Sequence, residues 1–521
     1  MWLAGATHIK EQEAGARYER GKHYESNGDA ALPEFVEDNF RQPFMRYPGA
    51  ALAGERKRIG VGNVTRLDDP LPGAEVPPEV GIGGIAGGHG QKAKEQDGGK
   101  EGSPFENVHG VSPTIIESGV SKDDMTRTAV NRRKERVACV FLLGLTLLNA
   151  ASVVRVAPLL RKGYQDFTNF YGAAEMVRGG QAARLYDLAL QSKVQEQIAP
   201  NVAIRQGGLP YMHPPFEALL FLPLTYLSYL PAYMVWTFLN IIMLALSLGI
   251  AWEAFPEVRS LSVTFIVLCA GGFVPLTNGI IQGQDSVLLL LLATLSLAYF
   301  ETRRDVAGGV ALGAGLFRFH LALPMAVIMA VRRPRLLLGL VPMAAALVAI
   351  STAISGWRGL AGYFELLFRL EQTGAGGAIP SVGMPSLRGL IAELPGANAG
   401  SSLVVGLTLA ASLVVAGAVV WVITKRNVPL RLVFALAIMT AILLSYHTFT
   451  HDLTLLLIVI LLLVSEPPAI GGWGDTVLLI VVYTLFLGWS WWPRLIPFWF
   501  VPMVGWVFWR LRRGGRQDAV A

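Results

Sequence analysis

The stretch "NRRKERVACVFLLGLTLLNAASVV", residues 131–154, decides the fold class of this chain. Four basic residues within 132–136 lead directly into an apolar run over 137–154. The run is close to the roughly 20 residues that an α-helix needs to cross the hydrocarbon of a bilayer. It predicts a membrane-spanning helix whose first end lies in the cytoplasm, because Lys and Arg that flank a span are retained on that side.

Apolar runs of similar length recur through the rest of the chain, which has 521 residues, 52% of them hydrophobic and 16% charged. A soluble domain carries about 25% charged residues, so the composition excludes an ordinary soluble protein. We predict an all-α polytopic membrane protein, a bundle of roughly 10–13 transmembrane helices. The predicted spans are 137–154, 232–252, 260–277, 286–300, 335–355, 402–424, 429–445, 452–465, 475–490 and 495–510.

Residues 1–124 differ from everything that follows, because they are rich in Gly, Pro and charged residues and contain no apolar run. Low-complexity stretches such as "GIGGIAGGHG" (81–90) are typical of chains that bury no core. We interpret 1–124 as a disordered or non-native extension and 125–521 as the membrane domain. Two alternatives stay open: translation begins at Met125, or it begins at Met1 and the extension is a genuine cytosolic tail.

Basic residues at the span ends also predict which loops lie outside. Loops 155–212 and 356–401 are expected on the outer face of the cell membrane (plasma or inner membrane), and the first has the apolar spacing of amphipathic helices. Two stretches do not fit simple crossings. We expect 213–252 to contain a re-entrant piece, whereas 306–331 is either two half-helices or one buried span.

The motif "FRFH" (317–320) places Arg318 and His320 near or within the bilayer. An ionisable group in a span costs ~2.5–3.5 kcal/mol on insertion scales, so it must face a cavity or a partner. The pair favours an anion site in which Arg318 binds phosphate oxygens and His320 supplies a donor or a proton. The alternative is a structural ion pair of Arg318 with Asp285 or Asp452.

A second polar motif, "SYHTFTHD" (445–452), contains His447, His451 and Asp452 between two apolar runs. The histidines are four residues apart, but no H-E-x-x-H pattern is present and a turn here would break the helical spacing. We therefore expect hydrogen bonds to a polar substrate or a lipid phosphate, and we predict no metal site. Helix capping or packing is the alternative.

Two further candidates flank the first outer loop. Asp166, in "YQDFTNFY" (164–171), is an acid among aromatic residues just after the first span, and an interfacial aromatic belt alone requires no carboxylate. His213, in "YMHPPFEALLF" (211–221), is held at the membrane rim, because the two prolines that follow it turn the chain.

The order of several short motifs resembles glycosyltransferase family 87, the polyprenyl-phosphate-mannose-dependent mannosyltransferase-like proteins with a GT-C fold. The resemblance covers about 137–465. The motifs are "DFTNFY", "GGQAARLYD", "HPPFEALLFLPL", "GQDSVLLLLLATL", "GGVALGAGLFRFHLALP", "MPSLRGLI" and "HTFTHDLTLLL".

The resemblance implies a polyprenyl-phosphate sugar donor and an inverting transfer on the outer face. Asp166 matches the acid that acts as general base, taking the proton of the acceptor hydroxyl. Ser386 and Arg388, in "MPSLRGL", match a loop that we expect to bind phosphate, although a loop arginine is often merely solvated. The family usually has a Lys-Pro pair where this chain has Arg318-Phe319, which puts substrate identity in doubt more than reaction class.

The stretch "QGQD" (282–285) matches the family's Gly-Gln motif at the start of a span. Gln282, Gln284 and Asp285 are therefore candidates for binding sugar hydroxyls. For Asp285 the alternative is helix capping, because it directly precedes an apolar run.

The resemblance thus implies a membrane hexosyltransferase, with mannose as the expected sugar, that glycosylates an envelope glycan or glycolipid. A transporter or flippase, or an inactive partner protein of the same fold, is the alternative. Nucleic-acid binding is not expected, since the basic residues mostly flank spans. No cofactor is predicted, and the sequence does not decide whether a divalent metal assists the phosphate.

Overall fold

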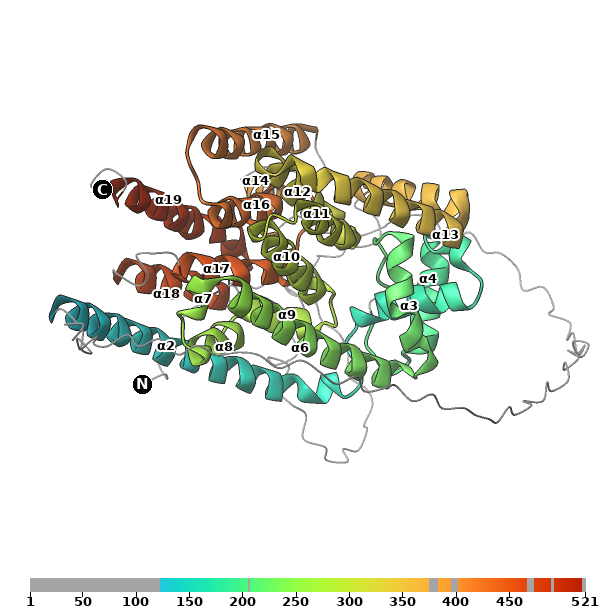
Figure 1. The fold of residues 1–521 in the computed structure, drawn as a ribbon. Helices are drawn as coiled ribbons and strands as arrows, with labels where there is room; N and C mark the ends of the chain where they lie inside the picture. The colour runs from blue at the N-terminus through green and yellow to red at the C-terminus, as the bar shows by residue number, and fades with distance from the viewer. Residues whose placement is uncertain are drawn as a thin grey trace, which may run out of the picture. The chain divides into compact units, whose positions relative to one another are not determined.

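The structure of the protein is a computed structural model that describes residues 122–204, 207–373, 383–394, 402–465, 473–488 and 492–517. These residues form helices and turns, with no strand among them (Figure 1). The predicted all-α class is therefore confirmed. The predicted extension, 1–124, lies outside the described residues up to position 121.

The α-helices follow one another along the chain with short connections. They are α2 (Lys122–Leu160), α3 (Phe167–Arg178), α4 (Leu188–Ile198), α5 (Ala218–Phe221), α6 (Tyr229–Ala254), α7 (Pro256–Arg259), α8 (Val263–Gly271), α9 (Val274–Ile281), α10 (Ser286–Glu301), α11 (Asp305–Ala314), α12 (Phe319–Arg332), α13 (Leu337–Thr373), α14 (Leu387–Ala392), α15 (Ser402–Lys425), α16 (Leu430–Leu444), α17 (Leu456–Ser465), α18 (Trp473–Gly488) and α19 (Phe500–Gln517). Four 3-10 turns are important for the site: η2 (Ala182–Arg184), η3 (Pro215–Glu217), η5 (Gly315–Arg318) and η7 (Thr450–Leu455).

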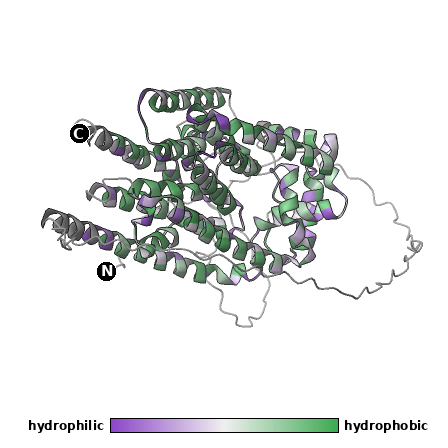
Figure 2. Cartoon of the chain, viewed as in Figure 1, coloured by the Kyte–Doolittle hydropathy of each residue, from purple (hydrophilic) through white to green (hydrophobic). Residues whose placement is uncertain are grey.

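Several helices are long and apolar enough to cross a membrane, so the protein is a multi-pass membrane protein. Within the described residues there are 5 such helices, or up to 6 if the α8–α9 pair, bent by 63°, forms one span. Four other apolar helices, α10, α16, α18 and the η7–α17 segment, have only 10–17 residues. The higher predicted number of crossings stays a prediction. Figure 2 shows the long helices as mainly hydrophobic.

Two of the shorter apolar helices form the interior of the bundle. Every residue of α17 is buried, and so are most residues of α16. A helix that is apolar on all sides is stable only when other helices surround it. α16 packs against α12 and α17, and α10 packs against both α6 and α11 (Figure 1).

The loop 155–212, which the basic residues predict to lie outside, contains the two predicted helices, α3 and α4, which pack against each other. Their aromatic residues are not a belt facing lipid. Phe167, Phe170 and Tyr171 are buried in a second apolar core together with Phe221 and Tyr229. In the stretch 213–252, residues 218–226 form only short helical turns before α6. These turns are too short to cross the bilayer.

The stretch 306–331 is one candidate span, 305–332, broken in its middle by η5. The second predicted outer loop, 356–401, is partly helical. α13 continues from its membrane segment to Thr373 across a kink at Gly356, where φ is 67°. Glycine adopts this left-handed conformation without a Cβ clash, so the chain changes direction there and then resumes a helix.

Glycines allow α11 and α13 to approach closely. A Cβ atom on Gly309 would lie 1.9 Å from the backbone oxygen of Leu336, and one on Gly339 would lie 2.0 Å from that of Val306. Small residues at helix crossings are a common basis of helix association in membranes.

We therefore expect Gly309→Ala to destabilise the protein by about 1–3 kcal/mol, because the added methyl group forces the two backbones apart. Gly417→Ala on α15 is the control, since no atom lies within 4 Å of its added Cβ. That change should be neutral or stabilising by up to about 1 kcal/mol. Thermal unfolding in detergent measures both, and equal stability of the two variants would contradict the close crossing.

Candidate active site

Arg318 lies at the end of η5, where the span 305–332 is broken, and only 3% of it is exposed. Its Nε donates to Asp285 Oδ1 at 2.8 Å, and its NH2 lies 2.5 Å from the same oxygen. Its NH1 lies 3.2 Å from Asp452 Oδ1. Both ion pairs considered for Arg318 are therefore present, as a buried guanidinium requires.

Gln284 connects this cation to the candidate base. Its Oε1 accepts a hydrogen bond from Arg318 NH2 at 2.7 Å, and its Nε2 donates to Asp166 Oδ2 at 3.1 Å. Asp166 lies at the N-terminus of α3 but makes no capping hydrogen bond with its side chain. The carboxylate is therefore oriented towards the 282–285 turn and not used to cap its own helix.

The 282–285 turn is fixed by α6. Trp236 Nε1 donates to the backbone oxygen of Gly283 at 3.0 Å, and the Tyr233 hydroxyl donates to that of Ile281 at 2.5 Å. Gly283 has φ 66°, and a Cβ there would lie 3.0 Å from that of Phe167. Glycine is required both by the conformation and by the close approach of α3.

Asp285 is at the N-cap position of α10, yet its side chain makes no capping hydrogen bond. The capping alternative for this residue is therefore wrong, because its carboxylate is directed to Arg318 instead.

The 445–452 segment has a turn where helical spacing would be needed for paired histidines. Residues 445–449 are not helical, and η7 begins at Thr450. His451 Nδ1 lies 3.1 Å from Gln282 Oε1, and its Nε2 lies 3.4 Å from Arg318 NH1. Asp452 Oδ2 accepts from the Phe449 backbone at 2.8 Å, so this residue both caps η7 and binds Arg318.

A second group of candidates lies beside His447. The His320 and His447 rings are 6.2 Å apart. Arg388 donates to the backbone oxygen of Tyr446 at 3.1 Å and stacks 4.0 Å above the Tyr446 ring. Several buried polar atoms here have no hydrogen-bond partner among the described residues: His320 Nε2, His447 Nδ1, Ser386 Oγ and Thr448 Oγ1.

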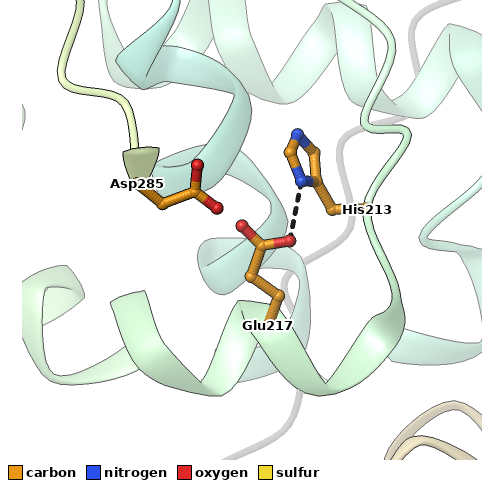
Figure 3. Close-up of side chains that lie close together, drawn as sticks. All are labelled: His213, Glu217 and Asp285. Atoms are coloured by element: carbon orange, nitrogen blue, oxygen red, sulfur yellow. Dashed lines mark ion pairs between the residues drawn. The ribbon is translucent and has the colours of Figure 1, made fainter. Parts of the chain in front are cut away.

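His213 contributes to a third group that the sequence did not reveal. Its Nδ1 lies 2.8 Å from Glu217 Oε2, and the ligating atoms of His213, Glu217 and Asp285 all lie within 4.8 Å of one another (Figure 3). The backbone oxygen of His213 accepts from the Tyr186 hydroxyl at 2.8 Å. Glu217 was missed, because the two prolines between it and His213 indicated a turn and not a helical pair.

Burial determines the charge of this group. It lowers the pKa of His213 to about 3, and the nearby Arg318 acts in the same direction. Burial, followed by the charge of Asp285, raises the pKa of Glu217. At neutral pH the imidazole is therefore neutral, and the Glu217 carboxylate needs a counter-charge or a proton.

The chain matches the model of one protein family. Residues 211–445 match the family model of glycosyltransferase family 87. The resemblance inferred from the motifs is thus confirmed for that part of the chain and supports a membrane glycosyltransferase. The match includes His213, Asp285, Arg318 and Arg388, whereas Asp166 and His451 lie outside it. No curated protein and no solved structure matches the chain.

Replacing Arg318 tests whether its ion pairs support the fold. We expect Arg318→Met to cost about 3–5 kcal/mol, because two buried carboxylates lose their cation. Adding Asp285→Asn should recover part of this loss. Arg335→Met is the control at an exposed arginine and should change stability by at most about 0.5 kcal/mol. Unfolding in detergent measures all three, and equal stability of Arg318→Met and Arg335→Met would contradict this role.

Proposed function

We propose that this protein transfers a hexose, with mannose as the first candidate, from a polyprenyl-phosphate donor to an envelope glycan or glycolipid. The observation that carries the proposal is the connection Asp166–Gln284–Arg318, which joins an outer-loop acid to a buried cation inside the region of the family match. We further propose the GT-C fold, the cell membrane as location and the outer face as the side of the reaction.

Asp166 is the proposed general base. A sugar transfer with inversion needs a group that removes the proton of the acceptor hydroxyl as its oxygen attacks the anomeric carbon. Gln284 donates to one carboxylate oxygen of Asp166, which restricts the orientation of the side chain. Such positioning is what a base needs to meet a bound hydroxyl.

The leaving group is a polyprenyl phosphate, whose negative charge must be stabilised. We assign the phosphate to the group around Arg388, whose guanidinium stacks on the ring of Tyr446, the residue before His447. The unpaired nitrogen atoms of His320 and His447 and the Ser386 hydroxyl lie in this group. Hydrogen bonds to a charged acceptor are strong, and Arg388 supplies the positive charge.

Replacing the proposed base should abolish transfer. Asp166→Asn keeps the size of the side chain but removes its basicity, so we expect the rate to fall about 10²–10⁴-fold. The assay uses purified protein in lipid, a labelled polyprenyl-phosphate mannose donor and a panel of glycan and glycolipid acceptors.

Asp187→Asn is the matched control, because Asp187 is in the same loop and caps α4 through Leu190. We expect that variant to retain its transfer rate. An Asp166→Asn variant as active as wild type would contradict the assigned base. A folded wild-type protein that transfers sugar from no lipid-linked donor would favour a transporter or an inactive partner.

The phosphate assignment makes a separate prediction. Arg388→Met should weaken binding of polyprenyl phosphate by about 10–100-fold, since a hydrogen bond to a charged group contributes about 1.5–3 kcal/mol. Arg388→Lys should recover part of the affinity. Equilibrium binding of the lipid phosphate, compared with the uncharged polyprenol, measures the effect. Equal loss for both lipids would contradict a phosphate contact.

A further inference from the structure

The group of His213, Glu217 and Asp285 has the composition of a cation site. The His213 imidazole lies just before η3, the Glu217 carboxylate is at the end of η3, and the Asp285 carboxylate is directly before α10 (Figure 3). Their ligating atoms lie within 4.8 Å of one another. Ligands about 2.0–2.2 Å from one Zn²⁺ ion are at most about 4.4 Å apart, so small side-chain movements would close such a site.

Two oxygen atoms in this group lack the donors that buried carboxylates need. Glu217 is 1% exposed and Asp285 is fully buried. Glu217 Oε1 and Asp285 Oδ2 have no hydrogen-bond donor among the described residues. Figure 3 shows the two carboxylates directed at each other. Buried polar atoms without partners are uncommon in folded proteins, and an ion is one explanation for them.

The balance of charges around these residues also favours a bound cation. Arg318 contacts Asp285 and Asp452, so one positive charge faces two carboxylates before Glu217 is added. Glu217 contacts His213 at 2.8 Å. If Asp285, Asp452 and Glu217 are all ionised, their three negative charges face the single positive charge of Arg318, which leaves a net charge of −2. A divalent cation would balance them.

We propose that His213, Glu217 and Asp285 bind a divalent transition-metal cation. A single imidazole with two carboxylates suits Zn²⁺ or Mn²⁺ better than Mg²⁺, which prefers oxygen ligands and retains its water. The site lies beside Gln284, the residue that connects Arg318 with Asp166. The proposal does not depend on the sugar transfer proposed above, because binding is measured without any substrate.

The competing interpretation is a proton shared by Glu217 and Asp285. Two adjacent acids can share one proton when their like charges oppose full ionisation. In that case the group would bind no metal, and the two interpretations give opposite results in a titration.

The experiment is a titration of the chelator-treated, full-length protein in lipid nanodiscs with Mn²⁺, followed by electron paramagnetic resonance of the free ion. We expect one Mn²⁺ to bind per chain. Glu217→Gln should lower the affinity by at least about 10-fold. Loss of a residue that only hydrogen-bonds to a metal ligand already costs about 10–100-fold, and Glu217 would be a ligand itself. Zn²⁺ should displace the bound Mn²⁺.

Glu175→Gln is the matched control, because Glu175 is a carboxylate of α3 paired with Arg178 at 2.7 Å and lies outside the group. It should bind Mn²⁺ as wild type does. A second measurement needs no folded Glu217 variant: the bound Mn²⁺ of the wild type should show coupling to an imidazole ¹⁴N nucleus, absent in His213→Gln. Absence of stoichiometric binding, equal affinity of Glu217→Gln, or bound Mn²⁺ without ¹⁴N coupling would overturn the proposal.

Discussion

The burial of one guanidinium determines how the centre of this protein is arranged. Arg318 lies in the break of a membrane span and is charged under all conditions, so carboxylates must reach it. Asp285 comes from the start of α10 and Asp452 from η7, and each contributes an ion pair. Three segments far apart in the sequence therefore have to meet at this point. All three side chains are buried, so water cannot replace these ion pairs.

The loop 155–212 packs beside this centre through an apolar core of its own. The aromatic residues of α3 pack with Phe221 and Tyr229, and this packing places Asp166 next to Gln284. The same loop region positions His213 and Glu217 beside Asp285. A structural core and a polar site thus share the same short segments, and changes in the aromatic packing will also affect the polar groups.

The sequence predicted the parts of this arrangement that depend on local pattern. Hydropathy identified the apolar helices, and the cost of charge in a membrane singled out Arg318, for which an ion pair with Asp285 or Asp452 was the alternative to an anion site. It did not predict that Gln284 links Asp166 to Arg318, because that contact depends on how α3 approaches the 282–285 turn. Glu217 was missed for a related reason, since the prolines before it indicated a turn while its partner Asp285 is brought close only by the fold. The aromatic residues of α3 were typical of an interfacial belt in the sequence, whereas the packing of α3 buries them in a core.

The conformation of Gly283 has a consequence for how a substrate would be received. The turn is held from one side by Trp236 and approached from the other by Phe167, and its glycine already adopts a left-handed conformation. Gln282, Gln284 and Asp285 are therefore preorganised on a rigid backbone. A ligand that binds to them does not have to order a flexible loop, so little of its binding free energy is lost as conformational entropy. Recognition at this turn should depend on the fit of the ligand and not on its capacity to induce a closed state.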